Sequence, residues 1–162
     1  MGVEVDRERA RRVRRELKRH ETMQRAARAL RSRDLSVAEL DARLDRANVP
    51  TAARAEAIER LTSAGAVDDG RFAVSRAAAL ADRGAGNFLV RHDLEARGLV
   101  AEVIEAAIAS LEPEHLRAAR ICARRGTDPK TARYLARKGF SEDAIETACA
   151  DPVADPDTPV VR

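Results

Sequence analysis

The sequence predicts an all-α protein with three tandem three-helix repeats in an elongated array, preceded by a basic helical extension. Ala, Leu, Arg and Glu are abundant, and charged residues make up 35% of the 162-residue chain, a composition typical of helical proteins. No stretch alternates apolar and polar residues long enough to indicate a β-sheet. The third observation is a helix ending that recurs three times and indicates a repeated unit.

In this recurring ending, a leucine is followed four residues later by Asn or Gly and then by an apolar residue. The three examples are Leu44–Asn48–Val49, Leu94–Gly98–Leu99 and Leu135–Gly139–Phe140. Asn and Gly adopt the left-handed conformation beyond a helix end at least cost, and the next apolar residue can fold back onto the last turn. Each ending is followed by another amphipathic run with an isoleucine: Ile58, Ile104 and Ile145. Three such endings in register indicate a duplicated helix–cap–helix unit.

The chain begins with a basic extension over residues 1–20. Residues 1–35 carry twice as many Lys and Arg as Asp and Glu, whereas the body up to residue 150 is close to neutral. The extension is interpreted either as a solvated helix or as an arm that contacts phosphates. Residues 151–162 are acidic and contain three prolines, so a disordered tail is expected there.

Helix caps divide the region between extension and tail into its repeats. The predicted boundaries are residues 21–66, 67–112 and 113–150. Ser36 and Glu39 form a capping box at the start of a second helix. Asp68 and Asp69 lie at the start of the second repeat and are expected to cap its first helix rather than bind a metal ion. In the last repeat, Thr127 or Asp128 caps a helix that begins with proline.

No catalytic constellation is present in the sequence. The three histidines are isolated, and no phosphate loop, nucleophile elbow or zinc-binding helix motif occurs. Cys122 and Cys149 are far apart in sequence and are interpreted as ordinary buried thiols, with a redox or disulfide role as the alternative. The sequence therefore predicts no enzyme, no cofactor and no metal site. It has no membrane-spanning run and no secretion signal, so a cytoplasmic protein is expected.

Two consecutive predicted helices carry the same basic stripe. Arg117, Arg120 and Arg124 share the spacing i, i+3, i+7 with Lys130, Arg133 and Arg137. The candidate contact surface adds their neighbours and two arginines of the middle repeat: Arg125, Lys138, Arg91 and Arg97. A solvated face and a surface for an anionic partner, either phosphate backbone or an acidic protein groove, are both compatible with this pattern.

The few aromatic rings are expected in the core, because each lies in an apolar stripe or directly after a cap. They are Phe72, Phe88, Tyr134 and Phe140. Base stacking on exposed rings is therefore not expected. Contact with nucleic acid, if made, is expected through phosphates, independent of sequence and sensitive to salt.

The unit order and several segments resemble the RecX family of recombinase regulators. The segment that opens the middle repeat, residues 66–73 (AVDDGRFA), is the most specific. Supporting segments are residues 36–44, 93–99 (DLEARGL) and 137–141 (RKGFS). The resemblance covers residues 22–150 and leaves the basic extension outside it.

This resemblance implies three tandem three-helix units in a curved, elongated molecule that is not an enzyme. It implies binding to the RecA filament on single-stranded DNA and inhibition of recombinase ATP hydrolysis, strand exchange and co-protease activity, in DNA repair, recombination and the SOS response. The partner would be the RecA filament, with single-stranded DNA contacted through it or weakly by phosphate contacts. A monomer without a membrane partner is expected. The alternative is a helical regulator that binds duplex DNA directly, without RecA.

Overall fold

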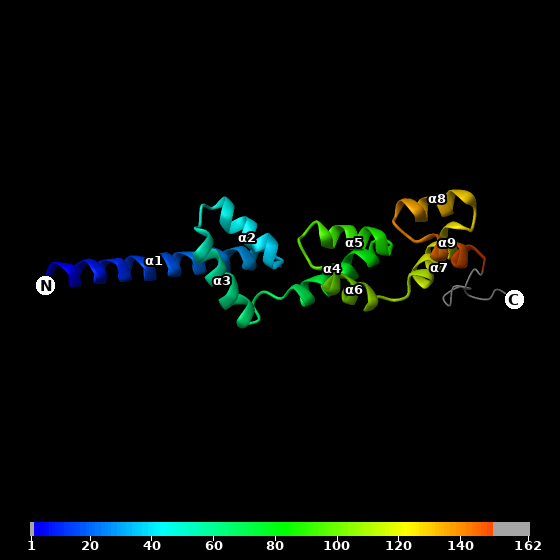
Figure 1. The fold of residues 1–162 in the computed structure, drawn as a ribbon. Helices are drawn as coiled ribbons and strands as arrows, with labels where there is room; N and C mark the ends of the chain where they lie inside the picture. Colours follow the sequence, from blue (N-terminus) through cyan, green and yellow to red (C-terminus); the bar gives the residue numbers. More distant parts are fainter. Residues whose placement is uncertain (1, 151–162) are drawn as a thin grey trace. The chain divides into compact units, whose positions relative to one another are not determined.

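The computed structural model describes residues 2–150 and the side chains of residues 6–150. This part of the chain consists of nine α-helices and contains no β-strand, which confirms the all-α prediction (Figure 1). None of these helices combines the length and the apolar content that crossing a bilayer requires. The tail over residues 151–162, predicted to be disordered, lies outside the described residues.

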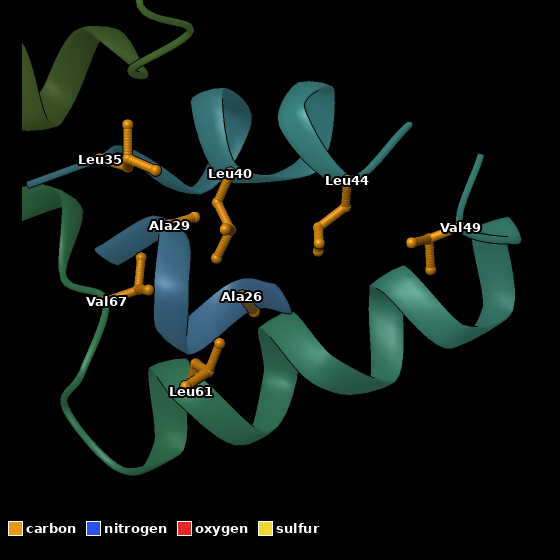
Figure 2. Packing of buried hydrophobic residues seen from close by; sticks show 8 residues of the cluster. All are labelled: Ala26, Ala29, Leu35, Leu40, Leu44, Val49, Leu61 and Val67. Atoms are coloured by element: carbon orange, nitrogen blue, oxygen red, sulfur yellow. The ribbon is translucent and has the colours of Figure 1, made fainter. Parts of the chain in front are cut away.

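The first three helices pack against one another: α1 (Gly2–Ser32), α2 (Val37–Arg46) and α3 (Thr51–Ser63). Figure 2 shows Leu40 and Leu44 pointing from α2 toward α1 and α3. The core cluster comprises Ala26, Ala29, Leu35, Leu40, Leu44, Val49, Leu61 and Val67. Alanines on α1 let the neighbouring leucines approach its backbone, so an interior almost without aromatic rings is closely packed.

The basic extension and the first repeat helix form one continuous helix, α1. Residues 6–21 are exposed, and Thr22, which is 5% exposed, is the first buried residue. The predicted division at residue 20 therefore coincides with the start of burial and not with a break in the helix. Along the exposed part, Val13 and Leu17 are the large apolar side chains, at 62% and 58% exposure.

The middle three helices are α4 (Asp69–Asp82), α5 (Asn87–Glu95) and α6 (Ala101–Ala109). Helices α5 and α6 pack together through buried side chains such as Leu94 and Ile104. An ion pair between Arg76 and Asp93 joins α4 to α5.

The last three helices also pack as a group: α7 (Glu114–Arg125), α8 (Pro129–Arg137) and α9 (Glu142–Ala150). Asp128 is the N-cap of α8, and its carboxylate accepts the Thr131 N–H. This hydrogen bond lowers the pKa of Asp128 from its ordinary value. The cap predicted at Thr127 or Asp128 is therefore Asp128, and Ser141 caps α9 by accepting the Ala144 N–H.

The three recurring helix endings have the predicted geometry. Asn48, Gly98 and Gly139 have φ values of 56°, 76° and 80°. In each ending the N–H of the following apolar residue donates to the carbonyl oxygen of the anchor leucine: Val49 to Leu44, Leu99 to Leu94 and Phe140 to Leu135. All six of these side chains are buried. The same bonding pattern also ends α3 at Gly65–Ala66 and α4 at Gly84–Ala85, so this local motif occurs five times within residues 2–150.

The chain divides into two compact units, Met1–Phe72 and Ala73–Arg162. Within the second unit, the start of α5 lies directly on the end of α8. The Gly86 N–H donates to the Lys138 carbonyl oxygen at 2.7 Å, and the Phe88 N–H donates to that of Gly139 at 3.0 Å. A Cβ at Gly86 would lie 2.2 Å from the Gly139 carbonyl, so only glycine allows this contact. The three-repeat boundaries and the curvature of the array stay predictions.

We call α1–α3, α4–α6 and α7–α9 the three helix triplets. At the start of two of them, a carboxylate accepts a main-chain hydrogen bond from the second helix of the preceding triplet. Asp69, the first residue of α4, accepts the N–H of Val37 at 2.8 Å. Glu114, the first residue of α7, accepts the N–H of Asn87 at 2.6 Å, and its other oxygen accepts the Ser141 hydroxyl. Val37 and Asn87 are the first residues of α2 and α5, where N–H groups lack partners within the helix. These carboxylates therefore link successive triplets through the main chain.

Leu94→Ala is expected to lower the free energy of unfolding by about 2–5 kcal/mol, because the leucine is completely buried and its removal leaves a cavity. Urea denaturation followed by circular dichroism measures this loss. The control is Leu116→Ala, since Leu116 is 37% exposed. Equal losses in the two variants would contradict the assignment of Leu94 as a core anchor.

Candidate functional site

Arg117 lies in the interior, whereas the sequence places it on the basic surface. It is 5% exposed. Its guanidinium donates to the carbonyl oxygens of Ala85 and Glu112, at 2.7 and 3.0 Å, and to Oδ1 of Asn87. It also lies over the ring of Phe140, with 5.7 Å from Cζ to the ring centre. The prediction that Arg117 belongs to the exposed surface is wrong, because the turn before α5 supplies acceptors that draw this side chain inward.

Burial lowers the pKa of Arg117 from its ordinary value, and the charges of Glu114 and Glu112 oppose this shift. A buried guanidinium is tolerated when its donors are satisfied, which these acceptors achieve. Arg117 is therefore a structural link between α7 and the start of α5.

Beside Arg117, an open groove of about 650 Å³ lies between the end of α4 and α7. Most of its charged lining residues are arginines. The lining comprises Ala81, Asp82, Arg83, Gly84, Arg117, Arg120, Ile121, Arg124, Arg125, Tyr134 and Phe140. With one carboxylate against five guanidinium groups, the lining has a net positive charge suited to an anion.

Two of the groove arginines, Arg83 and Arg124, are exposed and have no carboxylate partner within residues 6–150. Arg120 pairs with Glu112 at 2.5 Å. The guanidinium of Arg125 lies 4.2 Å from the ring centre of Tyr134, which fixes its position without reducing its charge. Guanidinium groups held in this way match the oxygens of a phosphate group.

The basic stripe of α8 is also exposed, but it lies outside the groove lining. Lys130, Arg133 and Arg137 are exposed, and none of them forms an ion pair within the described part of the chain, although the charge of Lys130 acts on Asp128. Lys138 is half-buried and borders the groove, since a Cβ at Gly84 would lie 3.9 Å from its Cε. We call Arg124, Lys130, Arg133, Arg137 and Lys138 the unpaired cations of the last triplet.

The two candidate arginines of the middle repeat are occupied by ion pairs. Arg91 binds both oxygens of Glu105, at 2.9 and 3.0 Å. Arg97 and Arg76 both bind Asp93, and their hydrogen bonds hold the pKa of this carboxyl well below its ordinary value. Their charges are thus partly neutralised, and these arginines contribute less to an anion-binding surface than the unpaired cations do.

Sequence reasoning missed Phe88 as a surface residue. Its side chain is 67% exposed, so the expectation of a buried ring is wrong here, although Phe72 and Phe140 are buried as expected. The repeat itself carries a signal for this exposure: Phe88 is the second residue of its helix, and the second residues of α2 and α8 are Ala38 and Lys130. A core position would not alternate between a ring, a methyl group and a lysine.

Arg83 was also missed, and no sequence signal identifies it, because the groove forms only when the end of α4 meets α7. Tyr134, expected in the core, is half-buried and lines the groove. Within the described residues, no group of three or more His, Cys, Asp and Glu side chains is arranged to hold a metal ion.

No family model matches the chain. The chain is 37% identical over 136 residues to the regulatory protein RecX of Stenotrophomonas maltophilia, which covers 78% of this chain and 83% of that protein. The chain belongs to the RecX family. A second RecX relative, from Xanthomonas axonopodis pv. citri, is 35% identical over 144 residues and matches 83% of this chain and 89% of its own length.

Solved RecX structures share this fold. The crystal structure of RecX from Lactobacillus salivarius superimposes with a TM-score of 0.75 over 83% of this chain and 96% of its own, at 18% identity. A second crystal structure, of a regulatory protein RecX, gives 0.71 over 83% and 72% of the two chains, also at 18% identity. The all-helical arrangement is therefore the RecX fold, in agreement with the sequence resemblance.

Proposed function

We propose that this RecX-family chain regulates the RecA recombinase. It binds the RecA filament on single-stranded DNA as a monomer and inhibits ATP hydrolysis, strand exchange and co-protease activity in DNA repair and the SOS response. The observation that carries this proposal is the identity of 37% and 35% to two proteins named as regulatory proteins RecX, over most of each chain.

The chemistry of the last triplet supports an anionic contact. A RecA filament on single-stranded DNA presents phosphates along its length, and the unpaired cations of the last triplet are free to neutralise them. Arg83, Arg120 and Arg125 of the groove extend the candidate contact. Phosphate contacts are independent of base sequence, so the protein would act anywhere along a filament.

Repeated contacts along a filament also strengthen a weak individual contact. Once one contact has formed, the next phosphate or subunit is held close, and its effective concentration is high. The regulatory effect would then come from occupation of the filament rather than from chemistry carried out by this chain.

The proposal is tested by measuring DNA-dependent ATP hydrolysis by the cognate RecA while the protein is added up to stoichiometric amounts. Turnover is expected to fall as the protein occupies the filament. Unchanged turnover at stoichiometric protein would contradict the proposal. A sequence-specific gel shift on duplex DNA in the absence of RecA would instead support direct DNA binding.

A further inference from the structure

The two cysteines of the chain meet in the structure, although 27 residues separate them in sequence. Cys122 lies on α7 and Cys149 on α9, and these two helices pack against each other. The two sulfur atoms are 3.9 Å apart. Cys122 is 1% exposed and Cys149 is half-buried, and both are free thiols. No step of the proposed regulatory function uses this pair.

We infer that Cys122 and Cys149 form a peroxide-sensitive disulfide site that joins α7 to α9. A disulfide needs the sulfur atoms at about 2 Å, so each must move by about 1 Å from its position in contact. Rotation of the two side chains supplies part of this movement. Cys149 lies one residue before the end of α9, in the last turn, where the helix ends and carbonyl groups lack partners within it. The backbone is most easily adjusted at such a position.

The exposure of the two thiols sets the order of the reaction. Cys149 is reached by hydrogen peroxide first, because Cys122 is enclosed by the helices. Burial, followed by the contact with Cys149, raises the pKa of Cys122 to about 11, which keeps it a thiol at neutral pH. Since the thiolate is the nucleophile, Cys122 is slow to react with peroxide in solution. Its contact with Cys149 at 3.9 Å, rather than its acidity, makes it the second, resolving thiol.

The reaction consumes one peroxide for each disulfide. The Cys149 thiolate attacks one peroxide oxygen, the O–O bond breaks, and the leaving hydroxide takes up a proton to give water and a sulfenic acid on Cys149. Cys122 sulfur then attacks Cys149 sulfur, the S–O bond breaks, and hydroxide leaves with the Cys122 thiol proton as a second water. Two thiols together lose two electrons and two protons, and the peroxide is reduced to two waters.

The bond closes a loop that contains all of α8 and fixes α9 to the helix that carries Arg120, Arg124 and Arg125. Cross-linking across this loop lowers the entropy of the unfolded chain, so the oxidised protein is expected to be the more stable form. None of the groove arginines takes part in the bond. Oxidation therefore stabilises the last triplet without removing its positive charge.

The test treats the full chain with hydrogen peroxide, blocks remaining thiols with N-ethylmaleimide, and measures the intact mass without reductant. The expected product is a monomer that has lost two hydrogen atoms and carries no maleimide. Dithiothreitol restores both thiols. The unfolding midpoint of the oxidised protein is expected to rise by several degrees and to return after reduction.

Two variants separate the roles of the thiols. In Cys122→Ser, dimedone is expected to trap a sulfenic acid on Cys149, because no resolving thiol is present. In Cys149→Ser, Cys122 is expected to remain a thiol under the same treatment. Retention of both thiols in the wild type, addition of oxygen without loss of hydrogen, or reducible dimers would each overturn the inference.

Discussion

The triple variant Arg124→Glu, Arg133→Glu, Arg137→Glu is expected to bind the RecA–single-stranded DNA filament about 100-fold more weakly than the wild type near physiological salt. Each side chain is exposed and lacks a carboxylate partner within the described residues. The three substitutions change the net charge of the protein by six units. A loss of about 0.5 kcal/mol of binding free energy for each unit of exposed charge gives a total loss of about 3 kcal/mol. Arg120 is left unchanged because Glu112 already pairs with it.

The salt dependence of binding is the decisive measurement for this variant. Fluorescence anisotropy of the labelled protein on preformed filaments gives the affinity over a range of salt concentrations. Each lost phosphate contact reduces the slope of log affinity against log salt by about 0.7 on a single strand, so a fall of about 2 is expected. An unchanged affinity and slope would show that these side chains are merely solvated.

Matched variants distinguish this surface from a general effect of net charge. Arg28→Glu, Arg43→Glu and Arg46→Glu together make the same charge change at exposed positions of the first unit. A triple substitution by lysine keeps the charge of the tested surface. We expect the first-unit variant and the lysine variant to bind within a few-fold of the wild type. A loss in the first-unit variant equal to that of the test variant would assign the effect to net charge alone.

Arg117→Ala is expected to produce the largest loss of stability among the arginine substitutions, about 3–5 kcal/mol in the free energy of unfolding. The variant removes the donor of three acceptors: the Ala85 carbonyl oxygen, whose bond to Arg117 is buried, and the part-buried Glu112 carbonyl oxygen and Asn87 Oδ1. It also leaves a cavity beside Phe140. Unpaired buried acceptors cost about 1–3 kcal/mol each before relaxation and water entry, and the cavity adds to this.

The comparison for this variant is Arg120→Ala, one helical turn away on α7. Arg120 is exposed and forms one surface ion pair, so its loss is expected to cost less than about 1 kcal/mol. Urea denaturation of both variants measures the difference. Arg117→Lys keeps the charge but not the forked donors, and an intermediate loss is expected. Equal stability of Arg117→Ala and Arg120→Ala would contradict the structural role of Arg117.

The helix endings were predictable from sequence because their geometry is decided locally. Asn48, Gly98 and Gly139 lie where the chain must adopt a positive φ, and few residues do so without strain. The hydrogen bonds that close these turns join residues only five positions apart. The capping box at Ser36 and the cap at Asp128 followed by proline are equally local, and both are present. Local chemistry was therefore sufficient for most of the fold.

The candidate site was less predictable, because its geometry depends on residues about 30 positions apart. The spacing of Arg117, Arg120 and Arg124 correctly identifies one side of a helix, but it does not show that Ala85 and Asn87 will surround the first of them. The contact between Cys122 and Cys149 likewise depends on how α7 packs on α9. Periodicity locates a helix face, whereas tertiary contacts decide which part of it remains accessible.

The carboxylate links of Asp69 and Glu114 depend on the peptide N–H at the first residue of a helix. Each link uses a peptide N–H as its donor, a group that every residue except proline carries, so the linked positions can differ as freely as Val37 and Asn87 do. In the last triplet, the corresponding first residue of the second helix is Pro129. The first residue of α8 therefore has no peptide N–H to donate in a link of this kind.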